Sequence, residues 1–214
     1  MLIDISQVLR PALPGWPGEP GFALNACAKI GADCPVNTAA VTFSTHAGTH
    51  ADAPLHYDAA GSDSAQTALD AYIGPCVVLD VRSCGARIEV EHVAWGAIGV
   101  AKRVLFRTYD RFPHDAWDHN STAIAPQVIE RLGALGVVLV GTDSASLDPQ
   151  ASKTMDAHHA VKRHGMRILE GLVLDAVRPG EYELIALPLA IAGADASPVR
   201  AVLRRFPPPT APSS

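Results

Sequence analysis

The chain has 214 residues, of which 48% are hydrophobic and 18% charged, a composition typical of a folded globular protein rather than a disordered one. Its formal net charge is −5, so it lacks the basic excess with which a dedicated nucleic-acid binder neutralises phosphates. No apolar run approaches the roughly 18 residues of a membrane span, and the first residues show no signal-peptide pattern. The four cysteines form no CxxC pair, so we expect them to be reduced and buried. We expect a single cytoplasmic domain over residues 1–206, with a flexible tail at 207–214 and no nucleic-acid or membrane partner.

Prolines and glycines crowd residues 11–20, where they exclude a helix and predict a rigid surface loop. Trp16 lies in the middle of this loop. Two roles are open for its side chain: it could pack the loop onto the body of the protein, or it could stack on an aromatic ligand.

Short strands and helices follow this loop along the chain. Strands are expected at 38–45, 76–81, 104–107, 137–140, 166–169, 182–187 and 199–206, and helices at 126–135 and 153–163. Pro126 suits the first turn of the earlier helix, and Gly133 and Gly136 suit its end. A helix followed by a buried apolar strand is typical of α/β proteins. We therefore expect an α/β fold in which a mixed β-sheet closes into a small barrel-like core with helices around it.

The densest chemistry lies in residues 45–57, THAGTHADAPLHY, where His46, His50, Asp52 and His56 form the pattern H-x3-H-x-D-x3-H. Imidazoles and a carboxylate without a nearby thiolate suit zinc or manganese. Two histidines and one aspartate leave a coordination position for water, which is typical of a catalytic metal site. The alternative is a polar loop that carries surface histidines.

The spacing of these residues limits the local structure. On a helix, Asp52 would lie about 120° around the axis from His46. On a straight strand, His46 and His56 would be about 33 Å apart, too far for one metal centre. The segment must therefore begin extended and then bend, and Gly48 and Pro54 are the residues that allow bending.

A second group of candidate ligands lies at 155–159, MDAHH, and at Glu170. Glu170 ends an apolar strand, where a carboxylate is costly to bury unless it is paired or bound to a metal. It is therefore a natural partner for a second metal. The alternative is that both histidines lie on a helix surface and Glu170 in a solvated turn. Spacing alone does not decide between His158 and His159.

Several segments resemble a known family. HAGTHADAPLHY at 46–57 resembles the HxGTHxDxPxH signature of the metal-dependent cyclase-type amidohydrolases. GWPGEP at 15–20, GTDSASLDPQASKTMDAHHAV at 141–161 and ILEGLVLD at 168–175 are similar to the bacterial kynurenine formamidases within that family. The resemblance extends over roughly residues 2–206.

The resemblance implies a binuclear zinc site. His46, His50 and Asp52 would hold one Zn²⁺, and Asp52, His158 and Glu170 would hold a second, with the two carboxylates shared. Mn²⁺ or Co²⁺ would also accept these ligands. The resemblance favours His158 over its neighbour.

The resemblance also implies an activity and an assembly. The substrate would be N-formyl-L-kynurenine, hydrolysed to L-kynurenine and formate by an arylformamidase of tryptophan degradation. His56 would be the catalytic acid/base, and Trp16 would contact the substrate. The fold would be the swivelling β/β/α type of the cyclase family, assembled as a homodimer. Two other functions stay open: hydrolysis of another aryl or cyclic amide such as an isatin-like ring, and metal binding without turnover.

Overall fold

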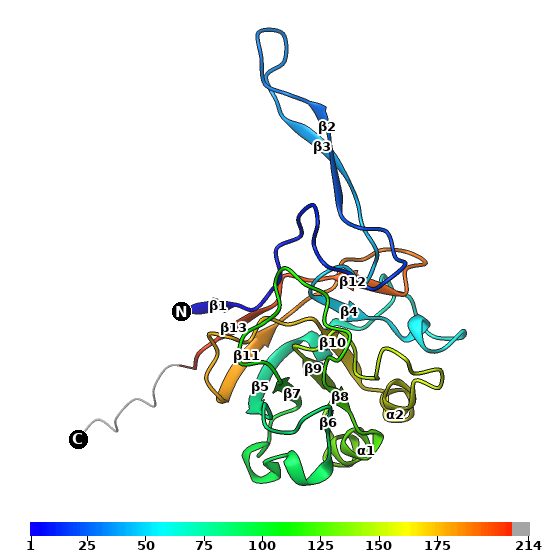
Figure 1. The fold of residues 1–214 in the computed structure, drawn as a ribbon, viewed down its shortest axis with the longest axis vertical. Coiled ribbons are helices and arrows are strands. Elements are labelled where there is room, and N and C mark those ends of the chain that lie inside the picture. The colour runs from blue at the N-terminus through cyan, green and yellow to red at the C-terminus, as the bar shows by residue number, and fades with distance from the viewer. Residues whose placement is uncertain (207–214) are drawn as a thin grey trace, which may run out of the picture.

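A nine-stranded mixed sheet forms the centre of the computed structural model, which describes residues 1–206 (Figure 1). Its strand order is β1-β13-β11-β5-β7-β9-β10-β4-β12. The central strands β5, β7, β9 and β10 run parallel, and the outer pairs are antiparallel. The bounds are β1 Leu2–Asp4, β4 His50–Asp52, β5 Ile73–Asp80, β7 Arg103–Arg107, β9 Leu139–Thr142, β10 Arg167–Glu170, β11 Gly180–Ile185, β12 Ala196–Pro198 and β13 Val202–Arg204. The tail predicted at 207–214 lies outside the described residues.

The sheet curves into a half-barrel, and two helices, α1 (Pro126–Ala134) and α2 (Asp156–Arg163), pack side by side against it (Figure 1). This confirms the predicted α/β fold with a barrel-like mixed sheet and outer helices. Within residues 1–206, no helix is both long and apolar enough to cross a membrane. Other short elements are the strand pair β6 (Arg87–Ile88) and β8 (Ala123–Ile124), and the 3₁₀ helices Pro54–His56, Leu69–Tyr72, Val90–His92 and Trp95–Ala97.

Apolar side chains cover both faces of the sheet, which is why its central strands read as continuous hydrophobic runs. Val77 of β5 joins the cluster that contains the apolar residues of both helices, whereas the next residue, Val78, joins the cluster on the other face. Helix α1 adds Val128, Ile129 and Leu132 to the first cluster, at the 3.6-residue spacing that predicted it.

All the expected elements are present, but their ends differ from the prediction by up to three residues, and two of these differences have a clear local cause. The strand expected at 38–45 is β3 (Thr38–Thr42), because the chain turns at 45–46. The helix expected from 153 begins at Asp156, because Met155 has a left-handed φ of 49° and cannot continue a helix.

An extended hairpin, residues 23–42, projects from the body of the protein (Figure 1). Only its second strand was expected from the sequence. Strand β2 (Ala23–Ala28) pairs with β3, and we call the whole hairpin the arm. Nearly all of its residues are exposed, including Cys27 at its centre. The expectation of four buried cysteines is therefore wrong: only Cys76, in the core, is fully buried.

Candidate metal centre

The histidine-rich segment bends where its sequence requires. The chain turns at residues 45–48, forms β4 and then enters the 3₁₀ helix at Pro54. Gly48 has a left-handed φ of 64°, and a Cβ at this position would lie 2.9 Å from the Leu9 side chain. Glycine is therefore needed for the backbone conformation, whereas the end of the Leu9 side chain could move to make room for a Cβ.

Strand pairing brings the two carboxylates together. Strand β10 runs antiparallel to β4, with Glu170 opposite His50 and Ile168 opposite Asp52. Residues directly opposite each other in an antiparallel pair lie about 4.5–5.5 Å apart. Helix α2 adds His158, whose side chain is 1% exposed, whereas the adjacent His159 is exposed. The structure therefore turns His158, and not its neighbour, toward the cluster.

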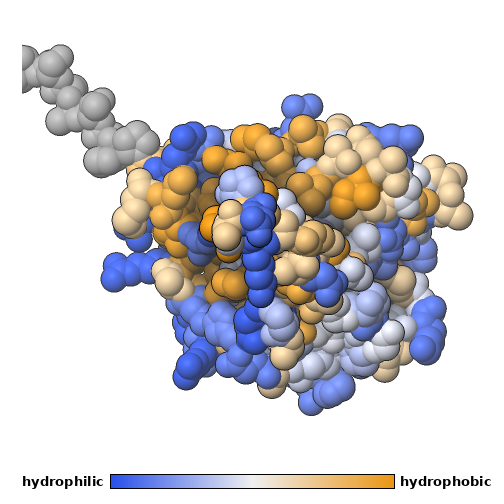
Figure 2. All heavy atoms as spheres, turned by 90° about the horizontal axis from the view of Figure 1, so that it is seen from above, coloured by the Kyte–Doolittle hydropathy of each residue, from blue (hydrophilic) through white to orange (hydrophobic). Residues whose placement is uncertain are grey.

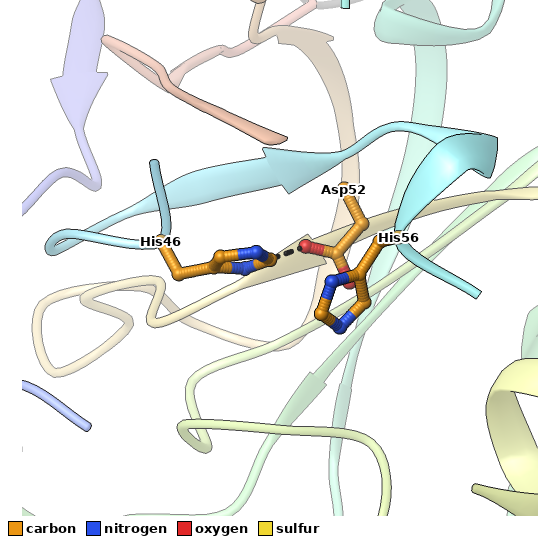
Figure 3. Close-up of side chains that lie close together, drawn as sticks. All are labelled: His46, Asp52 and His56. Carbon is orange, nitrogen blue, oxygen red and sulfur yellow. Dashed lines mark ion pairs between the residues drawn. The ribbon is translucent and has the colours of Figure 1, made fainter. Parts of the chain in front are cut away.

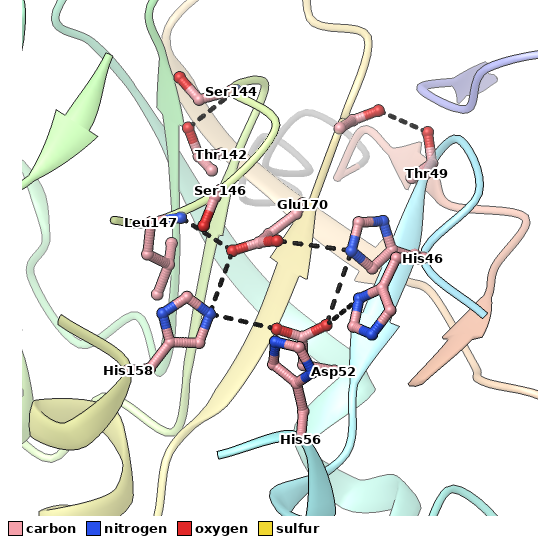
Figure 4. A network of polar contacts seen from close by, with 12 residues as sticks. His46, Thr49, Asp52, His56, Thr142, Ser144, Ser146, Leu147, His158 and Glu170 are labelled. Carbon is pink, nitrogen blue, oxygen red and sulfur yellow. Dashed lines mark hydrogen bonds and ion pairs between the residues drawn. The ribbon is translucent and has the colours of Figure 1, made fainter. Parts of the chain in front are cut away.

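Asp52 lies at the centre of this cluster (Figure 4). Its Oδ1 is 3.2 Å from Nδ1 of His46 and 3.5 Å from Nε2 of His50, and its Oδ2 is 3.4 Å from Nε2 of His158. Glu170 approaches the last two nitrogens at 3.4 and 3.6 Å. Five residues that are up to 124 positions apart in the sequence thus converge on one point.

Each of the three histidines is anchored through its second ring nitrogen. The pairs are His46 Nε2 with Asp195 Oδ2 at 3.0 Å, His50 Nδ1 with the Gly48 carbonyl at 3.0 Å, and His158 Nδ1 with Asp148 Oδ2 at 2.6 Å. Because all three partners accept hydrogen bonds, these nitrogens carry the hydrogen in the neutral rings. The opposite nitrogen of each ring then presents a lone pair to the carboxylates, which is how metal-binding histidines are oriented.

Four buried atoms at the centre of the cluster lack hydrogen-bond partners among the described residues. Nε2 of His50 and of His158, and both carboxylate oxygens of Asp52, are buried without a well-aligned hydrogen bond from any described residue. Lone pairs of imidazoles facing carboxylate oxygens at 3.4–3.6 Å repel each other unless a proton or a cation lies between them. The residues therefore fit divalent cations such as zinc, manganese or cobalt.

Distances between ligand atoms define two possible cation sites that share Asp52. One joins His46, Asp52 and His56, and the other joins His50, Asp52 and Glu170, with the ligand atoms of each group within 4.8 Å of one another. Figure 3 shows the first group, in which both imidazoles lie beside the Asp52 carboxylate. For His56, distance alone is compatible with ligation as well as with the predicted acid/base role.

The electrostatics of the cluster favour bound positive charge. Burial lowers the pKa of His46, but contacts with Asp52 and Asp195 outweigh it and raise the pKa to about 9. Burial likewise opposes a charged His158, yet Asp148 and Asp52 raise its pKa to about 10. Burial alone would raise the pKa of Asp52, but the imidazoles of His158 and His46 hold it well below its usual range. Because protons and cations occupy the same positions, metal binding should release protons.

A cavity of about 290 Å³ opens beside the cluster and is lined by His56 and by Trp16 of the opening loop. Trp117 lines the same cavity, with its ring 5.5 Å from that of Trp16 in an edge-to-face arrangement. Its indole Nε1 donates a hydrogen bond of 2.9 Å to Gln150. Trp16 therefore lies in a cavity wall rather than only between loop and body, and the aromatic walls suit a flat aromatic ligand.

Sequence reasoning missed three residues around this site. Trp117 carries no motif signal, since it lies in a loop without periodicity. Asp148 lies in a bent segment that follows β9, where an aspartate is ordinary, yet it anchors His158. Asp195 was not singled out, although it contacts two of the histidines. The rule that a ligating histidine needs an acceptor for its second nitrogen would have prompted a search for such carboxylates, but not their positions.

Known proteins resemble this chain in sequence and in fold. The family described as "Putative cyclase" matches residues 3–149. A protein named "Kynurenine formamidase" from Sphingopyxis alaskensis is 60% identical over 203 residues, covering 95% of this chain and 97% of the relative. Another of that name from Maricaulis maris is 58% identical over 204 residues, covering 95% and 98%.

Solved structures show the same architecture. A structure described as a potential metal-dependent hydrolase with cyclase activity has a TM-score of 0.84 at 27% identity, covering 97% of this chain and 99% of the other. An isatin hydrolase bound to the product analogue thioisatinate has a TM-score of 0.81 at 24% identity, covering 94% and 91%. The second similarity is one of fold alone.

Proposed function

The chain belongs to the putative cyclase family, and from this premise we propose that it is a metal-dependent arylformamidase that hydrolyses N-formyl-L-kynurenine to L-kynurenine and formate in tryptophan degradation. One observation carries the proposal: buried imidazole and carboxylate atoms that lack a hydrogen bond from any of residues 1–206 converge beside an aromatic cavity. The names of relatives at 58–60% identity support the choice of substrate.

His46, His50, Asp52, His158 and Glu170 would hold two zinc ions, or manganese or cobalt in their place. When bound, such cations supply Lewis acidity, which polarises a carbonyl and acidifies water. When a cation displaces the proton from the side that faces it, each ring keeps its remaining hydrogen on the second nitrogen, which is committed to an acceptor.

His56 is the residue that moves protons. Hydrolysis joins the water oxygen to the formyl carbon and breaks the bond from that carbon to the aromatic nitrogen, which must gain a proton as it leaves. A neutral imidazole has one nitrogen that can accept a proton and one N–H that can donate, so His56 can accept a proton from the water and donate one to the departing nitrogen. Such acid–base catalysis typically contributes ~10²–10⁴-fold to the rate.

Trp16 and Trp117 would hold the aromatic ring of the substrate. Their edge-to-face arrangement presents apolar surface on one wall of the cavity. Aromatic contacts of this kind are worth ~0.5–1.5 kcal/mol beyond the burial of area. They would orient the formyl group toward the metal cluster and His56.

A cytoplasmic homodimer is part of the proposal, with the arm as a contact between subunits. An isolated two-stranded hairpin is marginally stable in water, yet the arm exposes Leu24, Ile30, Val36 and Val41. Hydrophobic residues gather on the face from which the arm rises (Figure 2). Light scattering after gel filtration tests this: the protein should be a dimer, and a double change of Leu24 and Val41 to Glu should yield monomers.

Turnover of N-formyl-L-kynurenine tests the activity. Absorbance of free kynurenine is followed over time, and metal content is measured on the same sample. Treatment with a chelator should abolish turnover, and zinc should restore it. Hydrolysis of isatin without hydrolysis of the formamide would contradict the substrate, and metal binding without any turnover would contradict the enzyme.

A further inference from the structure

Asp195 contacts two imidazoles with a single oxygen. It precedes β12 and places Oδ2 3.0 Å from Nε2 of His46 and 3.3 Å from Nδ1 of His56. The other oxygen, Oδ1, accepts a hydrogen bond of 2.8 Å from the hydroxyl of Thr45. All of its contacts therefore come from the histidine-rich segment.

The backbone holds Asp195 in this position. Its carbonyl accepts a hydrogen bond of 2.9 Å from the amide of Ala53, next to β4. Two residues earlier, the amide of Gly193 donates a bond of 2.7 Å to Asp63. The carboxylate is thus fixed against the metal cluster, although its side chain is 41% exposed.

The chemistry of these contacts sets the position of a hydrogen on each ring. An ionised carboxylate only accepts hydrogen bonds, so Nε2 of His46 and Nδ1 of His56 must both be donors. A neutral imidazole has one N–H, so the lone pair then lies on the other nitrogen. On His46 this is Nδ1, which faces Asp52, and on His56 it is Nε2.

We propose that Asp195 is a positioning residue that sets the tautomer of His46 and His56 together, preparing the first for metal ligation and the second for proton transfer through Nε2. One carboxylate thereby couples the metal cluster to the acid/base. The part that concerns His56 rests on the proposed function, whereas the part that concerns His46 needs only a metal.

Asp195→Asn keeps the size of the side chain but replaces one acceptor oxygen with a donor NH₂. If the NH₂ faces the imidazoles, both rings lose their acceptor; if the oxygen faces them, they keep an uncharged acceptor whose hydrogen bonds are roughly half as strong. Either orientation weakens the control of both tautomers. Asp63→Asn is the matched control, because Asp63 anchors the same loop through Gly193 and touches neither imidazole.

Zinc affinity is the first readout and does not depend on activity. It is measured by competition with a chromogenic chelator for the wild type and both variants. Loss of an outer acceptor typically weakens metal binding 10–100-fold. We expect such a loss for Asp195→Asn and an affinity like that of the wild type for Asp63→Asn, which removes no acceptor from a ligand.

Dependence on the leaving group is the second readout, taken at saturating zinc with metal content checked. N-formylkynurenine releases an aniline, which needs a proton, whereas 4-nitrophenyl formate releases a phenolate, which does not. Asp195→Asn should lower kcat for the formamide on the order of 10²-fold, as expected when acid–base help is impaired, with little change in KM. It should lower kcat for the ester by much less, after subtraction of the spontaneous rate.

Unchanged zinc affinity in Asp195→Asn would overturn the inference, and so would equal losses of kcat on both substrates. Equal effects of Asp63→Asn would assign the defect to the loop rather than to the tautomers and would also overturn it. If the wild type hydrolyses neither compound, the proposed function fails, and the zinc affinity of Asp195→Asn alone decides the inference.

Discussion

Asp52→Asn should remove the metal sites without removing the fold. Asp52 is 1% exposed and is the one residue shared by both groups of possible ligands. The amide keeps the shape of the side chain but leaves only one oxygen for three imidazoles that lie 3.2–3.5 Å away. Its NH₂ group would face at least one of their lone pairs, where a cation would otherwise lie.

The size of the effect follows from binding linkage. Zinc at 100 times its dissociation constant stabilises the folded wild type by about 2.7 kcal/mol per site. For a chain of this length, 1 kcal/mol corresponds to roughly 2–4 °C in Tm. We therefore expect zinc to raise the Tm of the wild type by about 5–11 °C per site, and to leave that of Asp52→Asn unchanged.

Differential scanning fluorimetry with and without zinc measures this effect. The comparison is made within each protein, so any difference between the two metal-free proteins cancels. Asp63→Asn is the control, because Asp63 is a half-buried aspartate that accepts a backbone hydrogen bond outside the cluster. The rise in Tm that zinc causes in this variant should match that of the wild type. A zinc-dependent rise in Tm of Asp52→Asn equal to that of the wild type would refute the role of this carboxylate.

Three further changes separate the roles of neighbouring residues. His56→Ala should retain zinc and lose ~10²–10⁴-fold in kcat, as judged by kinetics and metal content on one sample; loss of metal in this variant would make His56 a ligand instead. Trp16→Ala should raise KM about 2–12-fold, the equivalent of ~0.5–1.5 kcal/mol of aromatic contact, and an unaltered KM would leave it a purely structural part of the loop. Asp148→Asn should weaken zinc binding 10–100-fold by freeing the second nitrogen of His158; chelator competition measures this, and an unchanged affinity would show that the ring needs no such anchor.

Local rules predicted most of the sheet and both helices. Strands β5, β7 and β9 are buried on both faces, so their sequences contain the continuous hydrophobic runs from which these strands were predicted. The bend at Gly48 also followed from the sequence, because no straight element could bring His46 near His56. The pairing of β4 with β10, which places Glu170 opposite His50, is a long-range contact that no local pattern encodes.

The arm and the outer carboxylates show where such rules stop. Strand β2 has few β-branched residues and no buried face, so nothing in its sequence distinguishes it from a loop. Asp195 follows a glycine-containing turn and reads as an ordinary surface residue. Its importance depends on the 3.0 Å contact with His46, across 149 positions of sequence.

Anomalous diffraction at the zinc absorption edge, on crystals of the zinc-loaded protein, tests the central claim most directly. We expect strong peaks enclosed by His46, His50, Asp52, His158 and Glu170, and their absence from crystals of Asp52→Asn. Active, zinc-containing protein whose peaks lie elsewhere, with nothing among these five side chains, would contradict the account.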